Sequence, residues 1–561
     1  MMKRMPSHFD TDAEDAKLAS LREQEEEDVA RLLSEKYKLA YTDLSVVPVN
    51  MDALRLIPEE KAREAEAVAF EHIGKKLSLA VHSPQSPVFQ ALLAELAQRE
   101  YEIEQFLVSK RSLDKAFARY EDLSYAHVST AGVFDISNDD LGKLMENFGS
   151  ITALAGHLEE TLSSKKSAQV SRIFEDIIAA ALSMKASDIH FEPEEHEVRL
   201  RFRIDGLLED AFNFEPKIYR TLKSRVKLLS GLKLNIENRA QDGRFTIQVQ
   251  GSEIEVRTSI IPGNYGESIV LRVLDPSSLQ KSLASMGIHP KLLDRLAKEI
   301  RRPNGMLLTT GPTGSGKTTS LYTFLKELHT PDVKIVTIED PIEYHLPGIV
   351  QTQTNGKDYT FASGLRSVLR QDPDVILVGE IRDAEVAETA IQAALTGHFV
   401  FSTLHTNNAA GTFPRLIDLG VDPKLFASAV TVAMAQRLVR TLDAGTRKAR
   451  PSTDEEKRMM QSALSTLTDT SLLPESYDTV YDPVPDANGA TGYRGRTGVY
   501  EAIFMDEELG TYLRDNPAEA DIAHHVVRQG YPTMLQDGIL KVLRGETTFE
   551  ELARVVELPQ T

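Results

Sequence analysis

The first part of the chain mixes helical and strand-like patterns. Apolar residues recur at helical spacing from Lys17 to Tyr37, and the apolar run 77–81 is typical of a β-strand. A weakly patterned stretch follows at 121–166. We therefore expect a small α/β domain over residues 1–120, with a disordered start at 1–16, and then a linker with helical pieces.

The next part of the chain predicts a second unit that is rich in strands. Residues 197–204 alternate between charged and apolar side chains, which places arginines on one face of a strand. Asp205-Gly206 then has the composition of a two-residue hairpin turn. These patterns predict a second α/β domain over residues 167–283. Its further strands are expected at 244–249, 254–260 and 268–274.

Short apolar runs alternate with helical stretches from residue 284 onward. The runs lie at 306–310, 334–338, 375–378 and 399–402. Strands separated by helices predict a mostly parallel, doubly wound sheet. A third domain is therefore expected over 284–561, with a C-terminal helical region at about 505–561. A polar insert at about 443–490 is rich in Ser, Thr, Asp and Pro, and we expect it to be poorly packed.

Composition narrows the possible functions. The chain has 561 residues, a formal net charge of −20 and no cysteine. An acidic chain is an unfavourable partner for nucleic acid, so no nucleic-acid ligand is expected. Without cysteine there is no thiolate zinc site, so no zinc is expected. No apolar run approaches the roughly 20 residues of a membrane span, and the polar N-terminus is not typical of a signal peptide.

A glycine-rich loop follows the first predicted strand of the third domain. The loop matches the Walker A pattern completely, and a helical run begins at Thr319. Backbone N–H groups of such a loop and the following helix N-terminus favour phosphate. Lys317 is expected to reach the β- and γ-phosphates, and the Thr318 hydroxyl is expected to bind Mg²⁺. ATP and Mg²⁺ are therefore the predicted cofactors. The loop residues are Gly311, Pro312, Thr313, Gly314, Ser315, Gly316, Lys317 and Thr318.

Two acidic clusters lie at the ends of predicted strands in the same domain. One is 338–343 and the other is 379–383. Ligands of open α/β sheets bind outside the carboxyl ends of the strands, so both clusters are expected to point at the nucleotide. ATP hydrolysis needs a carboxylate near Mg²⁺ and a group that orients water. The spacing alone does not say which carboxylate takes which task.

Histidines and arginines give less specific signals. His398 and His405 flank the last predicted strand of the sheet, and a lone histidine is more often structural than functional. Arg257 and Arg272 lie on adjacent predicted strands of the second domain. Arginine can supply positive charge to a γ-phosphate, although such residues are more often surface residues.

Four segments of the third domain resemble the Walker A, aspartate, Walker B and histidine boxes of bacterial secretion ATPases. This GspE/PilB-like family drives type II secretion and type IV pilus assembly. The resemblance covers residues 168–561 and extends to segments outside the ATPase boxes, such as 187–193, 436–440, 492–498 and 545–551. The four boxes are 310–319, 337–344, 369–383 and 396–407.

The resemblance implies roles for the site residues. It makes Glu343 the water-activating base and Glu380 the Walker B carboxylate, which acts on Mg²⁺ directly or through water. Arg257 and Arg272 match the paired arginines that contact the γ-phosphate. The histidines, His398 and His405, would couple the nucleotide state to domain movement.

The resemblance also implies an architecture and partners. The third domain would be a RecA-like P-loop ATPase domain, preceded by a PAS-like α/β domain and an N-terminal α/β docking domain. The assembly would be a homohexameric ring with nucleotide between the second and third domains. An inner-membrane platform protein and a cytoplasmic-facing membrane docking protein would be its partners. The protein would then be cytoplasmic, and its membrane association would be indirect.

This chain departs from the family pattern in two places. Many members carry a four-cysteine zinc module where this chain reads Leu442 to Thr446 and Pro485 to Asn488. Packing must replace any rigidity that zinc supplies there. Some pilus-type members also carry an N-terminal cyclic-dinucleotide motif that starts with Arg-Leu-Gly, and the sequence contains no such segment. The N-terminal domain is therefore interpreted as a docking module.

The leading hypothesis is a motor that uses ATP hydrolysis to assemble a type II secretion pseudopilus or a type IV pilus. A pilus-retraction motor is a close alternative, although the long region before residue 168 favours assembly. A nucleic-acid translocase, a small-molecule kinase and an inactive scaffold are weaker alternatives. The acidic charge disfavours the translocase, no acceptor pocket indicates a kinase, and the intact Lys317 and Glu343 disfavour the scaffold.

Overall fold

The structure is a computed structural model. It describes residues 26–559 apart from 48, 55, 74, 99–100, 123–125, 128–132, 137–144, 146–147, 164–168, 250–251, 277–281 and 486–490. The predicted disordered start at 1–16 lies outside the described residues, as does a large part of the predicted linker. Two compact units are present, one formed by 1–127 with 157–176 and the other by 128–156 with 177–561.

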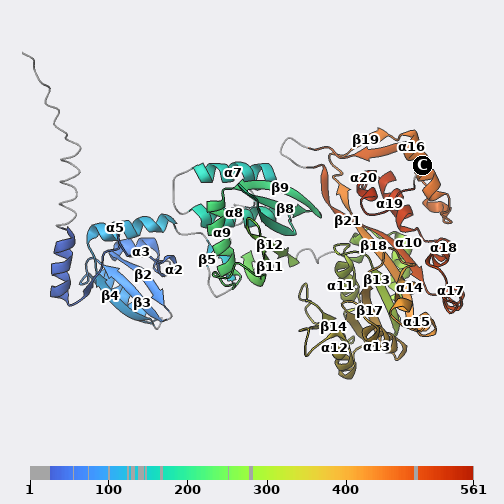
Figure 1. The fold of residues 1–561 in the computed structure, drawn as a ribbon, viewed down its shortest axis with the longest axis horizontal. Coiled ribbons are helices and arrows are strands. Elements are labelled where there is room, and N and C mark those ends of the chain that lie inside the picture. The colour runs from blue at the N-terminus through green and yellow to red at the C-terminus, as the bar shows by residue number, and fades with distance from the viewer. Residues whose placement is uncertain are drawn as a thin grey trace, which may run out of the picture. The chain divides into compact units, whose positions relative to one another are not determined.

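A four-stranded sheet forms the centre of the first unit (Figure 1). Its order is β1-β4-β3-β2, and all neighbours are parallel except the pair β2 and β3. The strand predicted at 77–81 is confirmed as β3, and α4 and α5 contribute to its buried core. Residues 26–37 are helical. The strands and further helices of this part are β1 Ala40–Tyr41, α2 Met51–Leu54, α3 Glu59–Glu64, β2 Ala67–Ile73, β3 Lys76–Val81, α4 Pro87–Gln98, β4 Glu102–Leu107 and α5 Lys110–Ala118.

A largely antiparallel sheet begins the second unit. From β6 onward the strand order is β6-β10-β11-β12-β7-β8-β9; β6 and β10 pair in parallel, and the neighbours from β10 to β9 pair antiparallel. The predicted hairpin turn is confirmed, because Asp205 and Gly206 have φ values of 48° and 90° between β8 and β9. The elements in this part are β5 Ala126–His127, β6 Val133–Ile136, α7 Ile151–Ser163, α8 Gln169–Ser183, β7 Asp188–Pro193, β8 Val198–Ile204, β9 Leu207–Phe214, α9 Pro216–Leu229, β10 Gln241–Val249, β11 Ser252–Gly263 and β12 Gly266–Leu274.

Arginines line one face of β8, as the alternating pattern predicts. Val198, Leu200 and Phe202 are buried, whereas the arginines between them remain partly exposed. The apolar side chains of β8 therefore belong to the core of this domain. The opposite face is charged and includes Arg199, Arg201 and Arg203.

A seven-stranded sheet forms the centre of the third domain. Its order is β15-β14-β16-β17-β13-β18-β21, with parallel pairs throughout except at β18 and β21. The predicted doubly wound, mostly parallel sheet is confirmed, with one antiparallel strand at its edge. The strands are β13 Gly305–Thr310, β14 Ile335–Glu339, β15 Val350–Gln353, β16 Val375–Val378, β17 Phe399–Leu404, β18 Val430–Leu442 and β21 Tyr493–Phe504.

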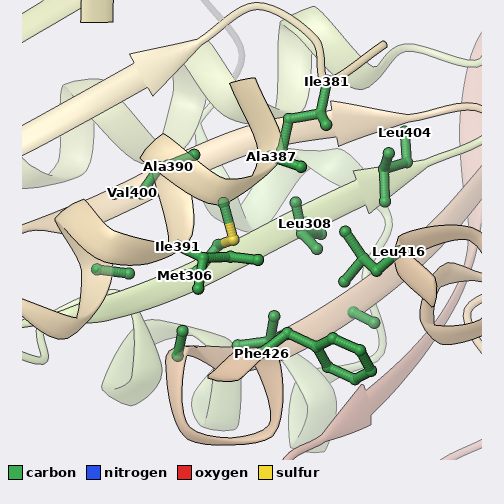
Figure 2. Close-up of a cluster of buried hydrophobic side chains, with 14 of the residues drawn as sticks. Met306, Leu308, Ile381, Ala387, Ala390, Ile391, Val400, Leu404, Leu416 and Phe426 are labelled. Carbon is green, nitrogen blue, oxygen red and sulfur yellow. The ribbon is translucent and has the colours of Figure 1, made fainter. Parts of the chain in front are cut away.

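Helices cover both faces of this sheet and create two cores. Met306 and Leu308 of β13 belong to the core beneath α12, α13, α14 and α15, which Figure 2 shows with Val400 and Phe426. Leu307, between them, belongs to the core on the other face with α10 and α11. The period of two along a strand divides the side chains in this way. The helices are α10 Pro290–Glu299, α11 Lys317–Leu328, α12 Phe361–Val368, α13 Ala384–Leu395, α14 Thr412–Asp418 and α15 Pro423–Ala429.

The insert contains a helix and a two-stranded ribbon. The prediction of poor packing is wrong for its described residues, because Met460, Leu464 and Val480 are buried in a core shared with Ile539 of α19. Residues 460, 463 and 464 lie on one face of α16, a spacing that the polar composition obscured. The elements of the insert are β19 Lys448–Pro451, α16 Asp454–Leu464 and β20 Thr479–Asp482.

The predicted C-terminal helical region is confirmed. It consists of α17 Glu507–Leu513, α18 Glu519–Arg528, α19 Met534–Leu543 and α20 Phe549–Ala553. None of the helices among the described residues is long and apolar enough to cross a membrane.

Candidate active site

The P-loop connects the buried strand β13 to α11, whose first residue is Lys317. Gly311 and Gly316 have φ values of 148° and 88°, which side chains rarely adopt. A Cβ atom on Gly311 would lie 2.7 Å from the Gln436 carbonyl oxygen and 2.7 Å from Ser315 Oγ. The loop is therefore closed against the neighbouring strand β18, and glycine is required where the two backbones approach.

The Lys317 ammonium lies over the start of the P-loop. Its Nζ donates to the carbonyl oxygens of Gly311 at 2.7 Å and Pro312 at 3.1 Å. Burial lowers the pKa of Lys317 to about 8, and the positive charge of Arg437 adds to that shift, whereas Glu380 opposes it. Lys317 is thus a partly desolvated cation at the helix N-terminus, a setting that favours phosphate.

The hydroxyls that follow Lys317 lie in the first turn of α11. Thr318 is exposed and Thr319 is partly exposed. Among the residues that the structure describes, no group of three or more His, Cys, Asp or Glu side chains could hold a metal ion. The Thr318 hydroxyl and the Glu380 carboxylate are the predicted ligands of Mg²⁺. Such a small set of side chains fits this ion, because proteins usually hold Mg²⁺ through one or two side chains together with the phosphates of the substrate.

Glu380 follows β16 and faces the histidine that follows β17. Its Oε1 accepts from Arg382 Nη2 at 2.5 Å, and its Oε2 lies 3.6 Å from His405 Nε2. Glu380 also acts electrostatically on Lys317. The structure therefore brings Glu380, His405 and the P-loop to one edge of the sheet, as parallel strands require.

His398 lies at the opposite end of β17 from His405. It precedes β17, and its Nδ1 is 3.1 Å from the Ala393 carbonyl oxygen at the end of α13. A six-residue strand separates His398 from His405, a span of roughly 20 Å. The structure does not bring the two predicted histidines together.

The first acidic cluster divides between the core and the site. Glu339 is buried and accepts from Thr337 Oγ1 at 2.6 Å and from Gln351 Nε2 at 3.1 Å, and it also accepts from the Tyr322 hydroxyl. Burial and the nearby Glu339 carboxylate raise the pKa of Tyr322. The expectation that the whole cluster points at the nucleotide is wrong for Glu339, because this carboxylate satisfies buried hydroxyls.

Glu343, four residues further on, contacts the second domain. Its Oε2 lies 3.3 Å from Nη1 of Arg257, and Nη2 of the same guanidinium donates to the Ile342 carbonyl oxygen. Arg257 Nε also donates to Glu255 at 3.0 Å. A strand of one domain thus delivers an arginine to the acidic turn of the other.

Arg272 lies opposite Arg257 in the register of β12 and β11. Its Nε lies 3.1 Å from Oδ1 of Asp188, a buried carboxylate on the next strand, β7. The other oxygen of Asp188 lies 3.3 Å from Arg203 Nε on β8. Asp188 therefore fixes Arg272 by its Nε atom while the rest of the side chain is more than half exposed.

Sequence reasoning missed the part that β18 plays in the site. The buried Gln436 donates from Nε2 to the Ser315 carbonyl oxygen at 2.8 Å and accepts from Ser320 Oγ at 2.8 Å. It thereby ties the P-loop to the first turns of α11. The signal in the sequence is the segment 436–440, which resembles the family pattern outside the four boxes.

Known proteins match this chain along most of its length. A family model described as "Type II/IV secretion system protein" matches residues 163–554. The chain belongs to the type II/IV secretion system protein family. The predicted resemblance to secretion ATPases is confirmed, and with it the class of ATP hydrolase. A second model, the "MshEN domain", matches residues 37–127, which the sequence analysis described only as a docking domain.

Relatives from secretion and pilus machines support this assignment. The chain is 38% identical to "Type II secretion system protein E" of Dickeya dadantii, over 92% of this chain and 100% of that protein. It is 34% identical to "Type IV pilus assembly ATPase PilB" of Myxococcus xanthus, over 94% and 91% of the two chains. The X-ray structure of the Legionella pneumophila ATPase DotB covers 68% of this chain and is itself 95% covered, with a TM-score of 0.50 and 23% identity. That likeness confirms the predicted RecA-like fold.

Proposed function

We propose that this protein hydrolyses MgATP as a subunit of a homohexameric ring, and that the ring powers assembly of a secretion pseudopilus or a pilus. The observation that carries the proposal is the contact of Arg257 with Glu343 beside the P-loop edge of the sheet. It brings a cation of the second domain to the acidic turn of the ATPase domain. Opening and closing of this contact can convert a chemical cycle into domain movement.

The P-loop residues bind and orient the nucleotide in this proposal. Residues Gly311 to Thr319 would hold the phosphates, with Lys317 on the β- and γ-phosphates. Thr318 and Glu380 would hold Mg²⁺, with Glu380 acting directly or through water. Bound Mg²⁺ neutralises the charge that develops on the phosphate oxygens.

The remaining site residues act on water and on charge. Glu343 would accept the proton of the attacking water as general base. Arg257 and Arg272 would supply positive charge to the γ-phosphate. His405 would link the Glu380 carboxylate to the end of β17, and His398 would couple the other end of that strand to domain movement.

We assign the domains to distinct tasks. Residues 1–120 would dock to a cytoplasmic-facing membrane protein, 121–166 would act as a linker, and 167–283 would carry the arginines. Residues 284–561 would form the ATPase domain, and an inner-membrane platform protein would be a further partner of the motor. The motor would then be cytoplasmic and peripheral to the inner membrane. Secretion is the first role to test, since the "Type II secretion system protein E" relative named above is 38% identical and the PilB relative 34%.

Purified protein tests the proposal through ATP turnover with Mg²⁺. Lys317→Ala is expected to abolish nucleotide binding and turnover together. Glu343→Gln is expected to keep nucleotide binding and to lower turnover by about 100-fold or more. Turnover near the wild-type rate in Glu343→Ala would reject the assigned base. Salt-sensitive stimulation of turnover by DNA would favour the translocase alternative. Cells that lack the protein and make no pili would favour an assembly motor, whereas cells that make pili but cannot retract them would favour a retraction motor.

A further inference from the structure

A second buried cation lies beside Lys317. Arg437 of β18 is 8% exposed, and its strand is the direct neighbour of β13 in the sheet. Arg437 Nη1 donates to the Gln436 carbonyl oxygen at 3.0 Å, and Nη2 donates to the Asn407 carbonyl oxygen at 2.6 Å. Asn407 lies two residues after His405, in the segment that follows β17. One guanidinium therefore connects β18 to the histidine-bearing loop.

The same guanidinium packs against the start of the P-loop. A Cβ atom on Gly311 would lie 3.0 Å from Arg437 Nη1. Nη1 therefore lies close to Gly311, where the absence of a side chain leaves room for it. Arg437 thus holds two segments of the site in place at once, the P-loop and the loop that follows β17.

The positive charge of Arg437 has no carboxylate in contact. Within the part of the chain that the structure describes, none lies within ion-pair distance, and its two hydrogen-bond acceptors are neutral carbonyl groups. Glu501 is the acidic group that acts on it electrostatically. Burial lowers the pKa of Arg437, since a guanidinium in this setting is poorly solvated. An uncompensated buried cation favours an anion nearby.

We propose that Arg437 is a positioning residue of the nucleotide site, which fixes Gly311 against the Asn407 loop and adds positive charge that favours a bound polyphosphate. The inference rests on the proposed ATP site at Lys317. It means that β18, the strand beside β13, contributes to the affinity for phosphate in addition to the Walker A residues. Arg437 acts from behind the loop, through Gly311 and through its charge.

Nucleotides that differ in their phosphates provide a readout that a purely structural role would not move. Arg437 Nη1 lies against Gly311 at the start of the P-loop, where the phosphates are proposed to bind. Loss of the Arg437 charge should therefore weaken the binding of ADP more than that of AMP. A general loosening of the fold should instead weaken both nucleotides alike.

The test measures the Kd of a fluorescent ADP and of a fluorescent AMP at pH 7 in the full chain. Arg437→Gln is expected to raise the Kd of ADP by about tenfold and the Kd of AMP by no more than about twofold. Arg437→Lys keeps the charge and is expected to restore the wild-type ratio of the two Kd values.

Arg440→Gln is the matched control, since Arg440 lies on the same strand but pairs with Glu551. It is expected to leave the ratio of the two Kd values unchanged. An equal increase in the Kd of both nucleotides for Arg437→Gln, or a wild-type Kd for ADP, would overturn the inference while leaving the proposed function intact. A wild-type protein that binds no ADP would instead overturn the proposed function. If Arg437→Gln does not fold, Arg437→Met removes the same charge and is judged by the same two Kd values.

Discussion

Arg257 and Glu343 form an ion pair, with 3.3 Å between Nη1 and Oε2, although they belong to different domains of the chain. The guanidinium holds the Glu343 carboxylate from the side of the second domain. The position of this carboxylate is therefore tied to the position of the second domain.

Arg257→Gln tests this relationship. Turnover is expected to fall by at least about tenfold, since the positive charge that we propose for the γ-phosphate is lost. In a double-mutant cycle with Glu343→Gln, the two effects are expected to be non-additive, because the residues act as a pair. The control is Arg244→Gln, since Arg244 lies opposite Arg257 on β10 and its side chain is 76% exposed. Additive losses in the cycle would show that the pair has no functional meaning.

Asp188→Asn tests how Arg272 is positioned. The buried carboxylate binds Arg272 and Arg203 from both oxygens, so its loss frees both side chains. We expect kcat to fall while KM for ATP stays near wild type, because the γ-phosphate charge matters most in the transition state. The control is Asp210→Asn, an exposed partner of Arg201 on the same sheet. A change in KM alone would contradict the assigned role of Arg272.

Leu308→Ala tests the core beneath the P-loop strand. Leu308 is fully buried between β13 and its covering helices (Figure 2). The substitution is expected to lower the free energy of unfolding by about 2–5 kcal/mol, measured by denaturant unfolding. Val350→Ala, on an exposed edge strand, is expected to have little effect. Equal losses for the two variants would show that burial in the sheet does not determine stability here.

Arg450→Ala tests the packing of the insert. Arg450 binds Asp482 across the ribbon at 2.9 Å and Glu456 at 2.6 Å. Its loss is expected to lower the Tm and to cost about 1 kcal/mol, since the network is partly exposed. Lys457→Ala, which removes a single exposed pair with Asp478, should leave the Tm unchanged. A zinc chelator should also leave the wild-type Tm unchanged, and a fall would contradict the prediction that the insert holds no zinc.

Contiguous motifs were predictable and distant contacts were not. The P-loop residues from Gly311 to Lys317 adjoin each other, so the sequence shows them together. The hydrophobic pattern did not show that Glu339 is buried in the core while Glu343 lies at the site. Every residue of β14 is buried, so alternation does not separate the two faces of this strand. Gln436 reaches Ser315 across 121 residues, a contact that only the strand order creates.

The fold of the second and third domains was predictable where periodicity is strong. The hairpin at Asp205-Gly206 follows from residues that tolerate positive φ. The insert was misjudged because composition was given more weight than the spacing of Met460 and Leu464. His398 and His405 show a further limit, since chemistry suggested one shared role while the strand between them sets them at opposite edges of the sheet.

The neighbour relation of β13 and β18 has a consequence for how the protein is made. β13 ends at Thr310, yet β18 begins only at Val430, after the chain has passed through β14, β16 and β17. Contacts between residues so far apart in sequence form slowly during folding, because the entropy of loop closure is lost before the contacts stabilise the chain. On the ribosome, the P-loop is therefore synthesised long before Gln436 and Arg437 exist to close it. A chain that stopped before Val430 would carry every Walker A residue and still lack the two side chains that hold the P-loop in place.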